Sequence, residues 1–318
     1  MEDLSPEPIA LGAWLEIVTS EYLAEFVPAG GAALRIAVME ETLIAPAIAR
    51  LGGLARRHQL LPVAIDAADT RLHMPQDLFF ALARAMDWTA LAQSFLEKLF
   101  AANAYAWPHP SRKLSRAALA EALAIAPPLL DHQINAWLTR AIWQNRAYAL
   151  DFRVGMLKLC DAALDPDPDA AAPVHQWLHG EKPSAVQLRA AGIGGRITRA
   201  NARAMLISLC HWVRACGAAG LLVTLDARRL HLPRPALEDG LRYSPAAVMD
   251  TFEVLRELID DAEHLPGLFA VVLDTEALIA GEPRRTLDSY DALRMRVWPD
   301  VRPGMGQNPV APLVWLAA

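Results

Sequence analysis

The sequence predicts an α/β fold in which a parallel sheet is flanked by helices and carries a large helical insertion. Three observations lead to this prediction. Short apolar segments that end in an acidic residue recur at 62–66, 220–226 and 268–274. Segments with apolar residues at helical spacing lie between them, and this alternation is typical of parallel sheets. The stretch 76–163 shows helical patterns and no strand pattern, which predicts the insertion.

Residues 1–75 predict the first part of the sheet. Apolar residues at helical spacing predict a helix over 7–27, which ends before a proline and a glycine pair. The segment 33–38 then predicts a strand, 43–58 a helix and 62–66 a second strand. This β-α-β unit has the length that a right-handed parallel crossover requires.

The helical insertion is expected to span 76–173. Its last segment, Asp165–Pro173, alternates acidic residues and prolines, so we expect a surface loop or hinge there. The expected helices are 76–87, 91–104, 116–123 and 129–148.

Residues 174–318 are expected to complete the α/β core. The strands at 220–226 and 268–274 are almost continuously apolar, as expected for strands buried on both faces. Helices are expected over 199–216 and 245–263, and a last strand over 312–316.

Composition excludes several classes of protein. The net charge of −6 argues against a protein that coats nucleic acid by charge alone, because phosphate neutralisation needs clustered Lys and Arg. No run of 18 apolar residues occurs and the N-terminus begins with acidic residues, so we expect a cytoplasmic protein. Cys160, Cys210 and Cys216 lack C-x-x-C spacing and are expected to be buried thiols.

Four separate blocks of sequence, in order, suggest a family. They are Trp177–Leu188, Gly220–Asp226, Leu255–Phe269 and Ser289–Arg294. These blocks resemble the BREX-system ATP-binding proteins of the BrxD type, which are bacterial anti-phage P-loop ATPases related to the AAA+ and origin-recognition group. The similarity is densest over about 174–315 and thinner over 22–75. The resemblance implies a P-loop NTPase, AAA+-like fold for the predicted sheet.

The family's phosphate-binding loop is expected to be degenerate. It should read G-x-x-x-x-G-K-[ST], whose backbone N–H groups and lysine hold the phosphates. The matching loop, 38–45, contains neither glycine nor lysine and places Glu40, Glu41 and Thr42 where a triphosphate would lie. Each glutamate would oppose a phosphate charge by roughly 3 kcal/mol at about 5 Å and an effective dielectric near 20. A structural role at the helix N-terminus is the simpler interpretation of the two glutamates.

The resemblance also assigns roles to residues at the later strands. Asp226 matches the aspartate that would hold Mg²⁺, but Ala227 occupies the place of the glutamate that would activate water. Thr275 matches the polar residue that senses the γ-phosphate. Arg294 and Arg296 lie where the resemblance places an arginine able to reach a phosphate, including one across a subunit boundary, although an ion pair within the chain is the simpler interpretation of Arg294.

The resemblance therefore implies a subunit that has lost ATPase chemistry. The chain ends at Ala318, where AAA+ relatives continue into a helical lid and a winged helix, so we expect both to be missing. We expect no ATP or Mg²⁺ as cofactors. The expected function is a protein-protein assembly or regulatory component of an anti-phage system, with an active ATPase or helicase of the same operon as its partner.

Two alternatives stay open. An active ATPase with an atypical pocket would need a cation in place of the missing lysine, and Arg35 and Arg56 are the nearest in sequence. A DNA-binding adaptor would use basic residues of the insertion, although a solvated face is their simpler interpretation. These residues are Arg112, Lys113 and Arg116, or Arg140 and Arg146.

Other patterns carry less information. His175 and His179 have the i, i+4 spacing of zinc ligands, but no third ligand is indicated, so no metal site is expected. The glycine-rich segment Gly192–Arg196 follows a helix and predicts a connector. No Gly-x-Ser-x-Gly elbow is present. Aromatic residues at helical spacing are expected to belong to the core rather than to stack on bases: Trp137, Trp143 and Tyr148.

Overall fold

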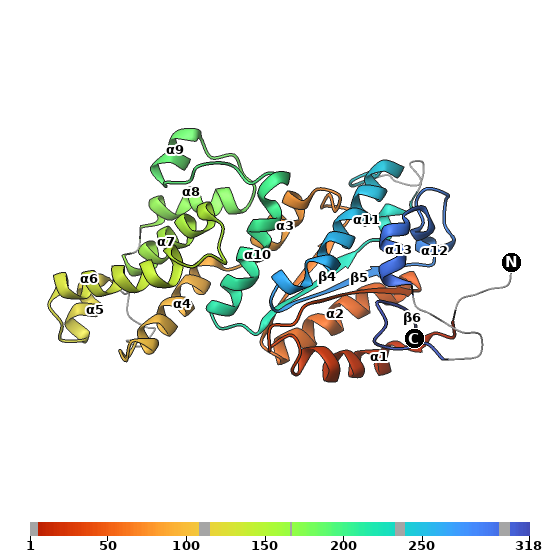
Figure 1. Cartoon of the computed structure of the whole chain (residues 1–318), viewed down its shortest axis with the longest axis horizontal. Coiled ribbons are helices and arrows are strands. Elements are labelled where there is room, and N and C mark those ends of the chain that lie inside the picture. Colours follow the sequence, from red (N-terminus) through yellow and green to blue (C-terminus); the bar gives the residue numbers. More distant parts are fainter. Residues whose placement is uncertain (1–5, 108–114, 166, 233–238, 299–305) are drawn as a thin grey trace. The chain divides into compact units, whose positions relative to one another are not determined.

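The computed structural model describes residues 6–107, 115–165, 167–232, 239–298 and 306–318 (Figure 1). The chain forms two compact units. The α/β unit comprises Met1–Leu78 and Ala218–Ala318, and the helical unit comprises Phe79–Gly217. The insertion predicted for 76–173 thus extends to Gly217, because 174–217 pack within the helical unit instead of completing the sheet.

The α/β unit contains a six-stranded, entirely parallel sheet with the order β1-β6-β2-β5-β4-β3. All seven residues of β4 and all seven of β5 are buried, because helices cover both faces of these central strands. The predicted parallel sheet is confirmed, and a two-residue edge strand, β1, is added to it. The strands are β1 (Ile9–Ala10), β2 (Ala33–Met39), β3 (Leu60–Asp66), β4 (Gly220–Asp226), β5 (Leu268–Asp274) and β6 (Leu313–Ala317).

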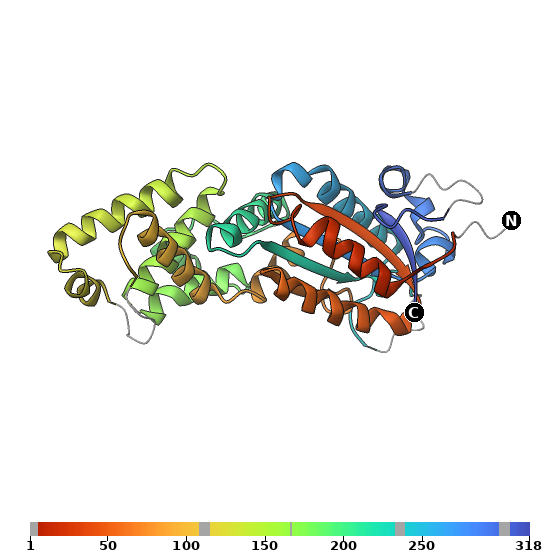
Figure 2. The same ribbon diagram turned by 90° about the horizontal axis from the view of Figure 1, so that it is seen from below.

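Helices cover both faces of this sheet. α1 and α2 lie side by side on one face, and α11 and α13 lie on the opposite face (Figures 1 and 2). Trp14 of α1, Leu51 of α2 and Phe269 of β5 are fully buried in the core beneath the first pair. The α-helices of the unit are α1 (Leu11–Val18), α2 (Glu41–Arg57), α11 (Pro245–Asp260), α12 (Ala277–Ala280) and α13 (Asp291–Val297), with short helical turns η1 (Thr19–Leu23), η3 (Arg228–Leu230), η5 (Ala262–His264) and η6 (Leu287–Ser289).

The order of the strands creates a switch point between β2 and β5. From β2 the chain passes through α2 to β3 at one edge, whereas from β5 it passes through α12 and α13 to β6 on the other side of β2. Because the two connections leave on opposite faces, the carboxyl ends of β2 and β5 form a topological switch point, the position at which open α/β sheets have their ligand-binding crevice.

The helical unit contains no strand among its described residues. Its core holds Phe95, Phe152 and Trp212, and the three cysteines are buried in this unit as predicted. None of the helices in the described ranges is long and apolar enough to cross a bilayer. The elements of the unit are α4 (Trp88–Ala102), α5 (Arg116–Ala122), α6 (Pro127–Leu138), the π-helical turn η2 (Thr139–Trp143), α7 (Leu150–Leu164), α8 (Pro168–Leu178), α9 (Ala185–Ala190) and α10 (Arg199–Ala215), while α3 (Pro75–Arg84) connects the two units.

Two predicted boundaries are wrong. The helix expected over 7–27 begins only at Leu11, because Ile9–Ala10 pair with β6. The loop expected at 165–173 is interrupted by α8, in which Asp167 caps the N-terminus and a proline fills the first position. Asp followed by Pro is a helix start signal as well as a turn signal, since proline needs no N–H partner in the first turn.

Candidate functional site

The carboxyl edge of the sheet brings most of the sequence-predicted site residues together. Val38 of β2 lies opposite Asp274 of β5, and Asp66 of β3 lies opposite Asp226 of β4. The ends of β2 and β5 lie at the switch point, and the ends of β4 and β3 follow along the same edge of the sheet. The predicted residues at this edge are Glu40, Glu41, Thr42, Asp226, Ala227 and Thr275.

The connection between β2 and α2 consists of Glu40 alone, since β2 ends at Met39 and α2 begins at Glu41. The prediction of a loop over 38–45 is wrong, because Val38 and Met39 still pair with β6 and the residues from Glu41 onward are helical. A phosphate-binding loop cradles its ligand with the backbone N–H groups of several consecutive loop residues. This one-residue turn has no backbone from which to form such a cradle.

The two glutamates differ in their surroundings. Glu40 is the N-cap of α2 with an extended backbone, but its side chain makes no capping hydrogen bond. Glu41 lies in the first turn, where a carboxylate interacts favourably with the helix dipole. Glu40, Glu41 and Thr42 are all exposed. The structural role expected for the pair therefore rests on Glu41.

Arg228 joins the turn after β2 to the end of β4. Its Nε and Nη2 donate to the two oxygens of Asp226, at 2.9 and 2.7 Å, and its Nη1 donates to Glu41 Oε1 at 2.8 Å. The hydrogen bonds that Arg228 donates to Asp226 raise the pKa of Arg228 above its usual value. We call this arrangement the Arg228 bridge; it balances one positive charge against two carboxylates.

A second basic residue, His231, is buried beneath the same edge. Its Nε2 lies 2.7 Å from Asp274 Oδ2, and its Nδ1 donates to the carbonyl oxygen of Arg285 at 2.7 Å. The side chains of His231 and Asp274 are each only 1% exposed. Burial opposes a charge on His231, but the Asp274 carboxylate and the hydrogen bond to the Arg285 carbonyl oxygen together outweigh burial and raise the pKa of the imidazole. Only the protonated ring can donate to both neighbours, since a carbonyl and a carboxylate both accept.

Arg285 ties this histidine to the surrounding loops. Its guanidinium is buried and donates from Nη1 to the carbonyl oxygen of Leu230 and from Nη2 to that of Tyr243, at 2.9 and 3.0 Å. Its Nε lies 3.0 Å from a carboxylate oxygen of Glu282. Arg285 thus links the segment that follows β5 to the segment that follows β4 by hydrogen bonds.

Ala227 and Thr275 follow the ends of β4 and β5. Ala227 is buried, and its N–H donates to the carbonyl oxygen of Leu273 at 2.9 Å. The Thr275 N–H donates to Asp274 Oδ1 at 2.8 Å. The residue after Asp226 accordingly has no side chain that could accept a proton from water.

Arg294 and Arg296 make ion pairs with neighbouring surface residues of the α/β unit. Arg294 Nε lies 3.1 Å from Asp288. Arg296 pairs with Asp260 at the end of α11, at 2.5 and 2.9 Å. Both guanidiniums therefore have partners within the chain, and neither contacts the carboxylates of Asp226 or Asp274.

The arginines nearest to the first strand in sequence do not supply a cation to the crevice. Arg35 donates from Nε to the hydroxyl of Tyr22 at 3.1 Å and from Nη1 to the carbonyl oxygen of Leu34. Arg56 lies in the last turn of α2, at the opposite end of the helix from Glu41. The cation at this place is Arg228.

Sequence reasoning missed Arg228, His231 and Arg285. The first two follow Asp226 within five residues, so their position after a strand end was an available signal. Arg285 is separated from His231 by 54 positions, and no local pattern connects them.

The basic residues considered for DNA binding have different surroundings. Arg112 and Lys113 lie outside the described residues. Arg116 pairs with three carboxylates, which gives it a structural role; these are Asp131, Asp161 and Asp165. Arg140 and Arg146 are exposed.

Of the three aromatic residues predicted for the core, Trp143 is the exception. Tyr148 is buried against Phe152, and Trp137 packs against Phe100. Trp143 is 45% exposed. The prediction fails there because the π-helical turn ends at Trp143 and changes the face on which the last side chain lies.

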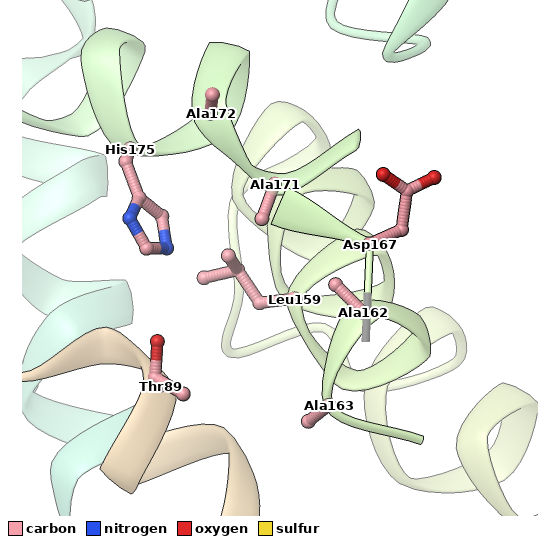
Figure 3. Close-up of a pocket in the computed structure, with 8 residues that line it drawn as sticks. All are labelled: Thr89, Leu159, Ala162, Ala163, Asp167, Ala171, Ala172 and His175. Atoms are coloured by element: carbon pink, nitrogen blue, oxygen red, sulfur yellow. The ribbon is translucent and has the colours of Figure 1, made fainter. Parts of the chain in front are cut away.

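The helical unit contains a separate small cavity of about 330 Å³ between α4, α7 and α8 (Figure 3). His175 and Thr89 point toward each other across it, and the remaining lining is mostly alanine. Burial lowers the pKa of His175, which favours the neutral ring. The ring centroids of His175 and His179 are 6.3 Å apart, and no group of three metal-ligating side chains occurs among the described residues.

The comparisons with known proteins identify a family. No curated protein and no solved structure matches the chain. The family described as BREX system ATP-binding protein BrxC/D matches residues 112–318, which is more than half of the 318 residues. The matched range includes β4, β5 and β6 and the buried His231–Asp274 pair. It also includes Asp226 and Arg228 of the Arg228 bridge, but not Glu41. The chain therefore belongs to the family of BREX system ATP-binding proteins BrxC/D.

Proposed function

We propose that this chain is a catalytically inactive, P-loop-like subunit that acts as an assembly or regulatory component of its system. Membership of a BREX family makes it a component of a bacterial anti-phage defence system. Such a system has operon partners, and the partner we propose is an active ATPase or helicase encoded in the same operon.

The observation that carries this proposal is the turn after β2. In a P-loop protein the loop between the first strand and its helix wraps the β- and γ-phosphates with backbone N–H groups and a lysine. Here one residue, Glu40, replaces the loop, and the next residue presents a second carboxylate. Both carboxylates repel phosphate, at roughly 3 kcal/mol for each pair of charges at about 5 Å.

The Arg228 bridge supports the proposal in a second way. Asp226 is the residue that would hold Mg²⁺, but both of its oxygens accept from the Arg228 guanidinium. A metal ion would have to displace an arginine held by a bidentate hydrogen bond, which is one of the stronger charged contacts. Ala227 beside it provides no base for an attacking water.

The sheet supports the P-loop-like assignment. β2 lies in the interior of a parallel sheet, and its carboxyl end borders the switch point, which is where this class of fold binds nucleotides. The switch point thus lies where a nucleotide site would lie, but the carboxylates around it would repel the phosphate groups of a nucleotide.

Isothermal titration of the full chain with ATP and Mg²⁺ tests the proposal. We expect no saturable heat at ATP concentrations up to about 1 mM, which corresponds to a binding free energy weaker than about −4 kcal/mol. Micromolar binding with Mg²⁺-dependent phosphate release would show instead an active ATPase with an atypical pocket.

Two variants sharpen this experiment. An atypical pocket would depend on Arg228, so any binding that is lost in Arg228→Ala and kept in Arg56→Ala would locate ATP in the crevice and contradict the proposal. Arg56 is a matched control because it is an exposed arginine on α2, away from the strand ends.

A further inference from the structure

Charge is divided unequally between the two units. The helical unit, Phe79–Gly217, contains 15 Lys and Arg against 10 Asp and Glu, whereas the α/β unit contains 15 against 26. The net charge of −6 therefore conceals a basic unit of +5 and an acidic unit of −11. Such asymmetry within one chain is typical of proteins that contact nucleic acid through one part only.

The basic charge is concentrated in two segments that contain no acidic residue. Residues 132–150 carry Arg140 and Arg146 and no Asp or Glu. Residues 182–225 also contain no Asp or Glu, and their basic residues are Lys182, Arg189, Arg196, Arg199, Arg203 and Arg214.

The fold brings these two segments into contact. The Ala149 N–H donates to Ser208 Oγ of α10 at 2.8 Å. The ring of Tyr148 packs edge-on against His211, also on α10, with centroids 6.4 Å apart. The chain that leaves η2 therefore lies against α10 at Ser208 and His211.

Two arginines of the first segment are exposed: Arg140 and Arg146. Within the described ranges, no acidic side chain forms an ion pair with either of them. Asp151, the acid nearest to Arg146 in sequence, accepts from the Gly194 N–H at 2.9 Å. The positive charge of the two arginines is therefore available to an external anion.

An exposed aromatic ring lies among these arginines. Trp143 is 45% exposed and follows Arg140 by three residues in the same π-helical turn, η2. Arg153 fixes the turn, because its Nη1 donates to the Trp143 carbonyl oxygen at 3.0 Å and its Nε to that of Tyr148 at 2.8 Å. The Trp143 indole is thus exposed to solvent, and hydrogen bonds from Arg153 fix its backbone.

We propose that the surface formed by Arg140, Trp143 and Arg146, called here the η2 basic surface, binds single-stranded nucleic acid. The arginines contact backbone phosphates, and a base stacks on Trp143. Arginines combined with an accessible indole are the features with which proteins hold unpaired strands, since every base offers a face for stacking. An acidic protein partner would use the charge but would have no base to place on the ring. The proposal does not depend on the nucleotide crevice.

Fluorescence anisotropy of the full chain with a labelled oligothymidine of about 20 nucleotides tests it, because single-strand-binding modules cover roughly 4–16 nucleotides. We expect binding at about 50 mM NaCl that weakens steeply with salt. The double change Arg140→Ala, Arg146→Ala should weaken binding at least tenfold and reduce the salt slope by about 1.4, at roughly 0.7 per lost phosphate contact.

Two comparisons separate the contributions. Trp143→Ala should weaken binding roughly tenfold with an unchanged salt slope, because stacking releases no counterions. The matched control removes the same charge from the α/β unit, in Arg56→Ala, Arg57→Ala on α2, whose side chains are likewise exposed. It should change binding less than about twofold.

Several results would overturn the proposal. These are no binding at low salt, an equal loss in the α2 control, or no effect of Trp143→Ala. Duplex DNA that binds as tightly as the single strand would overturn the stacking step. Competition by polyglutamate as effective as by oligothymidine would identify a surface for acidic proteins instead.

Discussion

Two basic side chains near the end of β4 determine the electrostatics of the carboxyl edge. Arg228 is about one third exposed and joins two carboxylates across the surface of the crevice. His231 is buried and shares its charge with Asp274. The first is a contact that water screens, so it contributes little to stability, whereas the second is a buried pair whose charges depend on each other.

The buried pair predicts a specific dependence of stability on pH. The pKa of His231 is raised above its usual value of 6.5 in the folded chain. The pair therefore contributes its full stability below about pH 6.5, and this contribution is lost as pH rises through the higher folded pKa. We expect the difference in unfolding free energy between the wild type and His231→Gln to fall as pH rises from 6.5, by at most about 1.4 kcal/mol per pH unit.

Urea denaturation between pH 6 and pH 9 measures this difference. His264→Gln is the matched control, because His264 is an exposed histidine of the same unit and should give a difference that does not vary with pH. A difference for His231→Gln that grows with rising pH would show that the imidazole is neutral in the folded chain.

At the scale of elements, α8 shows how a turn-like sequence becomes a helix. Asp167 Oδ1 accepts from the N–H groups of Asp169 and Ala170, at 3.0 and 3.1 Å, so it satisfies two N–H groups that the first turn leaves without partners. α8 also forms one wall of the small cavity with His175 (Figure 3). The cap therefore stabilises both the helix and the packing around the cavity.

Asp167→Ala should lower the unfolding free energy by about 1 kcal/mol, within the usual range of roughly 0.5–2 kcal/mol for a lost N-cap. Asp167→Ser removes the same charge but keeps a capping oxygen, so it should retain most of the stability. Thermal unfolding followed by circular dichroism distinguishes the two variants. Equal losses would mean that the charge near the helix dipole, and not the capping hydrogen bond, is what matters.

At the scale of the whole molecule, the two units have complementary properties. The α/β unit has a parallel sheet with carboxylates at the carboxyl ends of its strands, and the helical unit carries the net positive charge. In the function that we propose, such a chain contributes surfaces to an assembly instead of an ATPase cycle. Its association with a partner should then be independent of its own crevice.

Native mass spectrometry of the chain mixed with the intact ATPase or helicase of its operon tests this independence. We expect a complex at micromolar concentration, a binding free energy near −8 kcal/mol, in buffer without nucleotide. Arg228→Ala should leave the amount of complex unchanged. A complex that forms only with ATP and is lost in Arg228→Ala would assign a nucleotide-dependent role to this chain.

Much of the fold could be predicted from local patterns. β4 and β5 were located correctly because five or six nearly continuous apolar or β-branched positions that end in an acid leave few alternatives to a buried parallel strand. The helix start at Pro168 was missed because Asp and Pro favour turns and helix N-termini equally. The exposed Trp143 was missed because a π-helical turn changes the helical period on which the prediction relied.

The sequence by itself determined the parallel sheet, the acids at its strand ends and the absence of glycine and lysine after β2, because these depend on residue type and short spacing. Only the tertiary structure decided that Arg228 bridges Asp226 and Glu41, that His231 is buried on Asp274, and that two acid-free segments meet at α10. Arg228 and Glu41 are 187 positions apart in the sequence, and His231 and Asp274 are 43 positions apart. No local pattern encodes these contacts, since they follow from the order of the strands in the sheet.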